Sequence, residues 1–180
     1  MFLLDDVVQS QKHNYDYIIF DTPPSIEAIV INCLIAANRI IIPLELSAIS
    51  LKVMSRNEDF LEKLKAMHPA FQWDKILIVP NKFRKENIKI KALSMLQDIY
   101  QGRTDMVLSQ VVLPNSTVVD KSQDMIEPMY AMASNFGKEY KATQDSAREF
   151  TDLYWILCHE ILDEKLTHLI YANSDSEAEG

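Results

Sequence analysis

The sequence is poor in glycine. Only three of its 180 residues are glycine: Gly102, Gly137 and Gly180. A P-loop surrounds phosphate groups with glycine-rich backbone and completes the site with a Lys-Ser/Thr pair. None of the three glycines lies in such a loop, and Gly137-Lys138 is followed by Glu139 instead of a hydroxyl residue. The printed sequence therefore contains no P-loop.

Cysteine and histidine are also scarce. Cys33 and Cys158 lie in separate apolar, helix-like segments, and the four histidines are scattered along the chain. Zinc sites and disulfide frameworks place these residues at short, regular spacings. We therefore predict neither a disulfide nor a metal cluster of such residues. We expect both thiols to be buried and free, which suits a reducing cytosol.

Long hydrophobic runs and an excess of basic residues are absent as well. The longest apolar stretch, residues 26–46, is broken by Glu27, Arg39 and other polar residues, which is not the pattern of a membrane span. Asp5 and Asp6 interrupt the first apolar residues, so no signal peptide is expected. The net charge is −8, which argues against nucleic-acid binding by the whole surface but allows a local basic patch.

Length and composition fit a soluble globular protein. The chain is 48% apolar and 24% charged, and 180 residues can bury a real core within one domain. We expect a single α/β domain over residues 1–171. The polar, acidic residues 172–180 are expected to form a disordered tail.

The most informative segment of the chain runs from Tyr15 to Ser25. Its apolar run Tyr17–Phe20 is rich in β-branched and aromatic residues, which predicts a buried parallel strand. Ligands of open α/β sheets bind beyond the carboxyl ends of the strands, and Asp21 would stand at such an end. A carboxylate there suits Mg²⁺, held directly or through water, with the hydroxyl of Thr22 beside it. The alternative is an acid that only precedes the next helix.

The segment Asp21-Thr22-Pro23-Pro24-Ser25 resembles the Asp-x-Pro-Pro-Ser signature of the ParA/MinD family of deviant Walker ATPases. Residues 32–44 are similar to the block that ends in Ile-Ile-Pro in that family, and a looser likeness extends to about residue 165. The resemblance implies a P-loop NTPase-like fold with three α/β/α layers. The N-terminal phosphate-binding half of that fold is absent from this sequence, so the domain is expected to be incomplete.

The resemblance also implies roles for individual residues. Asp21 would be the Walker B and switch II carboxylate, acting as the catalytic and Mg²⁺-binding residue, with Thr22 next to it. Asn81 would contact the adenine of ATP, and Pro114 would pack on the base. Asparagine and proline after strands are also ordinary turn residues, and that alternative stays open. Glu127 stands where the family has a glycine, which departs from the nucleotide-pocket pattern.

Strands and helices alternate along the predicted chain. The patterns predict strands over 17–20, 39–43, 75–79 and 106–113, a further short strand over 129–133, and helices over 2–13, 26–37, 47–67, 87–100, 118–125 and 146–170. Ser25 and Ser146 are predicted to begin two of these helices, and Asn38 to end one in a left-handed conformation. Such alternation predicts a mostly parallel sheet flanked by helices.

A basic cluster stands out in this acidic chain. Five basic residues fall within ten positions, against one acid: Lys82, Arg84, Lys85, Lys89 and Lys91. ParA-like proteins hold nonspecific DNA through basic surface residues, so the resemblance implies DNA contact here. Affinity would follow the number of phosphates neutralised. The alternative is a solvated helix face.

The function implied by the resemblance is that of a partitioning ATPase in plasmid or chromosome segregation. The intact family hydrolyses ATP with Mg²⁺ as a homodimer, associates with DNA and responds to a ParB-like centromere-binding partner, in the cytoplasm and on the nucleoid. Without a P-loop, this chain alone is expected to be inactive and not to bind ATP. Two alternatives stay open: a non-catalytic interaction module that pairs with a full-length ParA-like ATPase, and an inert fragment.

Overall fold

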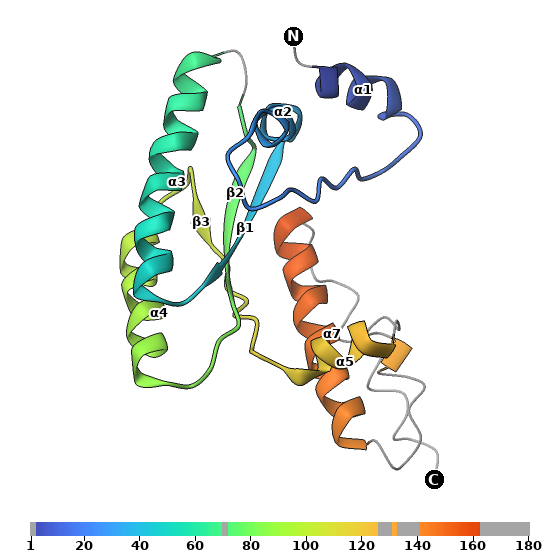
Figure 1. The fold of residues 1–180 in the computed structure, drawn as a ribbon, viewed down its shortest axis with the longest axis vertical. Helices are drawn as coiled ribbons and strands as arrows, with labels where there is room; N and C mark the ends of the chain where they lie inside the picture. The colour runs from blue at the N-terminus through green and yellow to red at the C-terminus, as the bar shows by residue number, and fades with distance from the viewer. Residues whose placement is uncertain (1–2, 70–71, 126–130, 133–140, 163–180) are drawn as a thin grey trace.

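The computed structural model describes residues 3–69, 72–125, 131–132 and 141–162 (Figure 1). In these residues three parallel strands form one sheet, in the order β1 (Arg39–Glu45), β2 (Lys75–Asn81) and β3 (Val107–Leu108). The helices are α1 (Leu3–Gln11), α2 (Ala28–Ala36), α3 (Ala48–Met67), α4 (Asn87–Tyr100), α5 (Thr117–Met125) and α7 (Lys141–Leu162). The predicted fold class, a parallel α/β sheet flanked by helices, is confirmed.

The central strand β2 is buried on both faces, and this explains its continuous apolar sequence. Ile76 and Ile78 pack with side chains of α3 and α4 in one core cluster. Leu77 and Val79 pack on the opposite face, where α7 contributes Phe150. Figure 1 shows the resulting layers, with α3 and α4 on one side of the sheet and α7 on the other.

The strand ends lie in register at both edges of the sheet. Arg39 pairs with Lys75 at the amino end, and Glu45 pairs with Asn81 at the carboxyl end. The first positions of β1 and β2 also hold the end of α7, because Arg39 and Lys75 donate to the carbonyl oxygens of Ile161 and Glu160. Cations at a helix C-terminus satisfy carbonyl groups that have no partner inside the helix.

The outer edge of β1 carries a proline. The carbonyl oxygens of Ile78 and Pro80 accept hydrogen bonds from the N–H groups of Ser109 and Leu113. The backbone polar groups of the even-numbered residues of β2 are therefore directed toward β3. The backbone groups of its odd-numbered residues are directed toward β1. Given the register of the two strands, the backbone groups of the odd-numbered residues of β1 are then directed to the outer edge of the sheet. Pro43 is one of them, so this edge lacks a donor at its fifth position.

The prediction of a strand at Tyr17–Phe20 is wrong. The segment between α1 and α2 forms no ladder, and Ile19 in it is 89% exposed. An apolar run indicates which residues tend to be buried. A strand also needs a neighbouring strand to pair its backbone groups, and the described residues supply none for this segment. The next helix, α2, begins after Glu27 instead of Ser25, and Asn38 is not left-handed.

Local predictions elsewhere were accurate for α1, α3, β2, α4 and α5, and Ser47 caps α3 by accepting from the Ser50 N–H at 3.1 Å. The strand predicted over 106–113 is reduced to two residues. Ala131 and Met132 are helical instead of extended. Helix α7 begins at Lys141, so Ser146 lies inside it and is not a cap. The rest of 129–133 and the tail 172–180 lie outside the described residues.

A carboxylate from α7 explains the short β3. Ser109 N–H bonds to Ile78 O and Leu113 N–H bonds to Pro80 O, so four residues span a distance that two residues cover on β2. The Glu160 carboxylate accepts from Ser109 Oγ at 2.6 Å and from the Gln110 N–H at 3.1 Å inside this bulge. The long-range contact replaces the ladder that the local sequence predicts.

Candidate functional site at the carboxyl edge of the sheet

Two loops meet where the strands end. Asn81 is the last residue of β2, and Phe83 two residues later forms a parallel bridge with Pro114. The Phe83 N–H donates to Leu113 O at 3.0 Å, and the Asn115 N–H donates to Phe83 O at 2.8 Å. The structure therefore brings the loops that carry Asn81 and Pro114 side by side. Whether either residue contacts a nucleotide stays a prediction.

Lys82 adopts a left-handed conformation at this edge, with φ of 51°. The conformation costs an L-residue about 1–2 kcal/mol. Two side chains hold it: Asn81 Oδ1 accepts from the Lys82 N–H at 2.8 Å, and Lys89 Nζ donates to the Lys82 carbonyl at 3.1 Å. The backbone bend turns the chain from β2 into the loop before α4.

Two of the five predicted DNA-contact residues are committed to structural bonds. Lys89 also lies 3.8 Å from the Glu45 carboxylate, and its side chain is only 16% exposed. With the Asn115 amide oriented so that its oxygen faces Arg84, that oxygen accepts from Nε and Nη2 at 2.6 Å each. Lys89 and Arg84 therefore tie β1, α4 and the two loops together.

The side chains of the other three basic residues are available for contacts with a ligand. Lys82, Lys85 and Lys91 are exposed, and none forms an ion pair or a side-chain hydrogen bond within the described residues. Their ammonium groups lie on the loop after β2 and on the first turns of α4. Exposed lysines of this kind contact phosphate without reading base sequence.

Asp21 and Thr22 are not part of this edge. Both are exposed, and neither makes a hydrogen bond or an ion pair to any described residue. Among all the described residues, no group of three or more His, Cys, Asp or Glu side chains could hold a metal ion. The roles predicted for Asp21 and Thr22 stay predictions.

Sequence reasoning missed Glu45 and Asn115, which organise the edge. Each directly follows or ends a strand-like run, as Asp21 does, so the same positional signal was present. What the sequence could not supply is the pairing of residues 81–83 with 113–115, because that contact joins segments about thirty positions apart.

Comparison with known proteins found one family model and several curated relatives. Residues 1–73 match the family model described as an AAA domain. Uncharacterized protein MJECL24 of Methanocaldococcus jannaschii is 29% identical over 133 residues, which cover 73% of this chain and 50% of the relative. Chromosome partitioning protein ParA of Myxococcus xanthus is 32% identical over 78 residues, or 43% of this chain and 28% of that protein.

Sporulation initiation inhibitor protein Soj of Bacillus subtilis is 38% identical over 53 residues, or 29% of this chain and 21% of Soj. Together these matches support a ParA-like P-loop ATPase family. The chain spans half or less of the length of these curated relatives. The basic loop at Lys82–Lys91 lies beyond the residues matched by the family model. Among the described residues, no helix has the length and apolar character of a membrane span.

Proposed function

We propose that this chain is the C-terminal part of a ParA-like partitioning ATPase and that the carboxyl edge of its sheet associates with DNA. The similarity to ParA and Soj supports the family. The observation that carries the DNA contact is the group of three exposed lysines, Lys82, Lys85 and Lys91, that no acidic side chain neutralises within the described residues.

Electrostatics sets the scale of this association. The whole chain carries a net charge of −8, which repels DNA at long range. Three phosphate contacts support weak, nonspecific, strongly salt-dependent binding. Such binding would serve a protein that rides on the nucleoid within the cytoplasm, as the resemblance to partitioning ATPases implies.

ATP and Mg²⁺ belong to the proposed family role, not to this chain alone. A P-loop supplies the backbone donors and the lysine that hold the β- and γ-phosphates. The 180 residues contain neither, and Asp21 is exposed and unpartnered within the described structure. We infer that this chain requires those groups from elsewhere before it can take part in ATP hydrolysis.

A second candidate function is a non-catalytic module that pairs with a full-length ParA-like ATPase. The observation in its favour is α2, which is apolar at every position except Asn32 and yet has no fully buried residue. A helix that is apolar all round is normally covered on every side. Ile29 on this helix is 61% exposed, and Tyr17 before it is 59% exposed. A ParB-like protein is the further partner that the resemblance suggests.

Binding to two labelled targets distinguishes the candidates. Fluorescence anisotropy with two unrelated DNA duplexes at low ionic strength tests the first, and we expect equal, salt-sensitive affinity for both duplexes. Analytical ultracentrifugation with purified Soj tests the second, and a complex without DNA affinity would favour the interaction module. If the chain binds neither DNA nor Soj, the remaining interpretation is an inert fragment.

A further inference from the structure

A pocket lies at the opposite edge of the sheet, where the strands begin. Its volume is about 240 Å³, and it lies between α3, the start of β2 and the loop from α4 to β3. The floor is apolar and belongs to the core, with Leu61, Ile76 and Met106 exposed by no more than 7%. Small-molecule sites measure about 300–1,000 Å³, so this pocket suits one long side chain better than a nucleotide.

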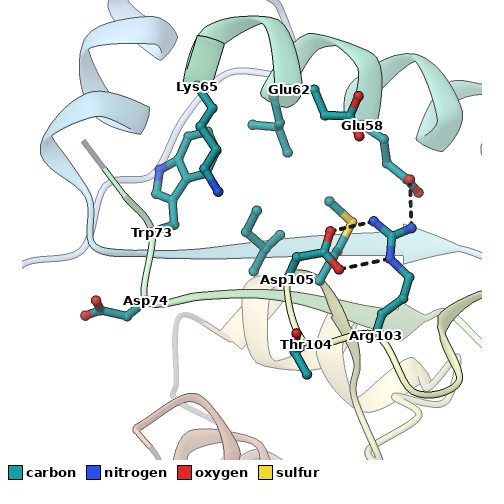
Figure 2. A pocket seen from close by; sticks show the side chains of 11 residues that line it. Glu58, Glu62, Lys65, Trp73, Asp74, Arg103, Thr104 and Asp105 are labelled. Atoms are coloured by element: carbon teal, nitrogen blue, oxygen red, sulfur yellow. Dashed lines mark hydrogen bonds and ion pairs between the residues drawn. The ribbon is translucent and has the colours of Figure 1, made fainter. Parts of the chain in front are cut away.

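One wall of the pocket is held rigid by an ion-pair network. Arg103 donates to both carboxylate oxygens of Asp105, at 3.1 and 2.7 Å, and to Glu58 at 3.0 Å. Its guanidinium also lies 5.1 Å from the ring centroid of Tyr100, whose hydroxyl bonds to Glu58. Figure 2 shows Arg103 with Asp105 and Glu58 on one side of the open space.

The opposite wall is aromatic. The indole of Trp73 is fixed because its Nε1 donates to Leu34 O at 2.8 Å. In Figure 2 the indole and Lys65 face the Arg103 network across the pocket, and Glu62 lies between them on α3. Arg103 is already bound by two carboxylates, whereas Glu62 makes no hydrogen bond or ion pair within the described residues.

The charge of the lining favours a cation. Four acids and two bases line the pocket, which leaves a formal charge of −2: Glu58, Glu62, Asp74 and Asp105 against Lys65 and Arg103. A planar guanidinium stacks on an indole face and pairs with carboxylates, and its aliphatic stem covers an apolar floor. The pocket matches each of these three parts.

We propose that this pocket binds an arginine side chain of a partner polypeptide, with the guanidinium between Trp73 and Glu62 and the stem over Leu61, Ile76 and Met106. The site is separate from the carboxyl edge and does not depend on DNA association. It offers the chain a protein contact at the end of the sheet opposite to the free lysines.

Trp73 provides the readout. The chain has two tryptophans, and Trp155→Phe on the exposed side of α7 leaves Trp73 as the only reporter. The probe is the acetylated, amidated hexapeptide (Gly-Arg)₃, and its control replaces each arginine by neutral citrulline. We expect a saturable change of Trp73 emission with the arginine peptide and none with the citrulline peptide.

Two variants with opposite expected effects test the charge argument. Glu62→Gln should weaken peptide binding about three- to fivefold, and Lys65→Gln should strengthen it by removing a like charge. The matched control is Glu149→Gln, an exposed and unpaired acid on α7 within the described residues, which should leave the affinity unchanged.

Three results would overturn the assignment. The first is equal weakening by Glu62→Gln and Glu149→Gln, which would mean attraction to the net charge alone. The second is the absence of a saturable change in the presence of either peptide. The third is a Trp73 emission that depends on protein concentration without peptide, which would place a second copy of the chain in the pocket.

Discussion

Lys89 Nζ lies 3.1 Å from the carbonyl oxygen of Lys82, so a lysine of α4 closes the loop that carries another lysine of the same basic cluster. The two residues therefore have different structural roles. Lys89 holds the left-handed turn together, whereas Lys82 is exposed and its ammonium group has no partner among the described residues. The five basic residues of the cluster are not equivalent, and substitutions can separate their contributions to stability from those to DNA binding.

Replacing the three free lysines, Lys82, Lys85 and Lys91, with alanine should reduce the salt dependence of DNA binding. Each lost phosphate contact lowers the slope of log K against log salt by about 0.9, so the triple variant should lose up to about 2.7. Anisotropy titrations at several salt concentrations measure the slope. The control is alanine at Lys52 and Lys63, two exposed lysines of α3, and an equal loss there would contradict a local binding site.

Lys89→Ala should act mainly on folding. Its side chain is mostly buried and supports Lys82 O and Glu45, so we expect a loss of about 1 kcal/mol in the free energy of unfolding. Urea denaturation followed by circular dichroism gives this value. Lys91→Ala on the same helix is the matched control and should change stability by less than about 0.5 kcal/mol. Equal effects of the two variants would refute the division of roles.

Ser109→Ala should destabilise the protein by about 1–3 kcal/mol. The substitution removes the donor to Glu160 and the acceptor of the Val111 N–H at a buried position, and the carboxylate keeps only Gln110. Urea denaturation measures the loss. The exposed Ser94→Ala on α4 serves as the control and should lie within about 0.5 kcal/mol of the parent. A neutral Ser109→Ala would mean that the bulge does not depend on this network.

Acid should weaken the wall of the pocket. The Arg103 guanidinium bonds to both carboxylate oxygens and holds the pKa of Asp105 below its ordinary value near 3.8. Such a carboxylate contributes stability above its unfolded pKa, and the contribution is lost as the pH falls through the folded value. The stability gap between the parent and Asp105→Asn should therefore shrink below about pH 4. A difference in unfolding free energy between the parent and Asp105→Asn that stays constant in acid would contradict this prediction.

Pro43→Val should promote self-association. Proline withholds a donor from the outer edge of β1, and free strand edges with a full set of donors pair with other chains. Valine restores the N–H and keeps an apolar side chain. Sedimentation velocity should reveal larger species for Pro43→Val than for the parent at equal concentration. A Val119→Ile change on α5, away from the edge, should leave sedimentation unaltered.

Local signals decided how far the sequence could be interpreted. Helix α3 is predicted almost to the residue because its apolar residues recur at helical spacing and Pro69 follows its end. The strand at Tyr17–Phe20 and the length of β3 failed because both depend on distant partners: the first has none among the described residues, and the second meets Glu160 about fifty positions away. At the site, the composition of the basic cluster was evident, but the commitment of Lys89 and Arg84 was not.

The position of α7 in the chain sets the order in which this protein can be completed during synthesis. One face of β2, formed by Leu77 and Val79, packs against Phe150 and Leu157 of that helix. About eighty residues separate the end of β2 from the end of α7. At a translation rate of about 5–20 residues per second, this face waits roughly 4–16 s for its cover. During that interval the nascent sheet presents its apolar side chains to the ribosome surface and to chaperones.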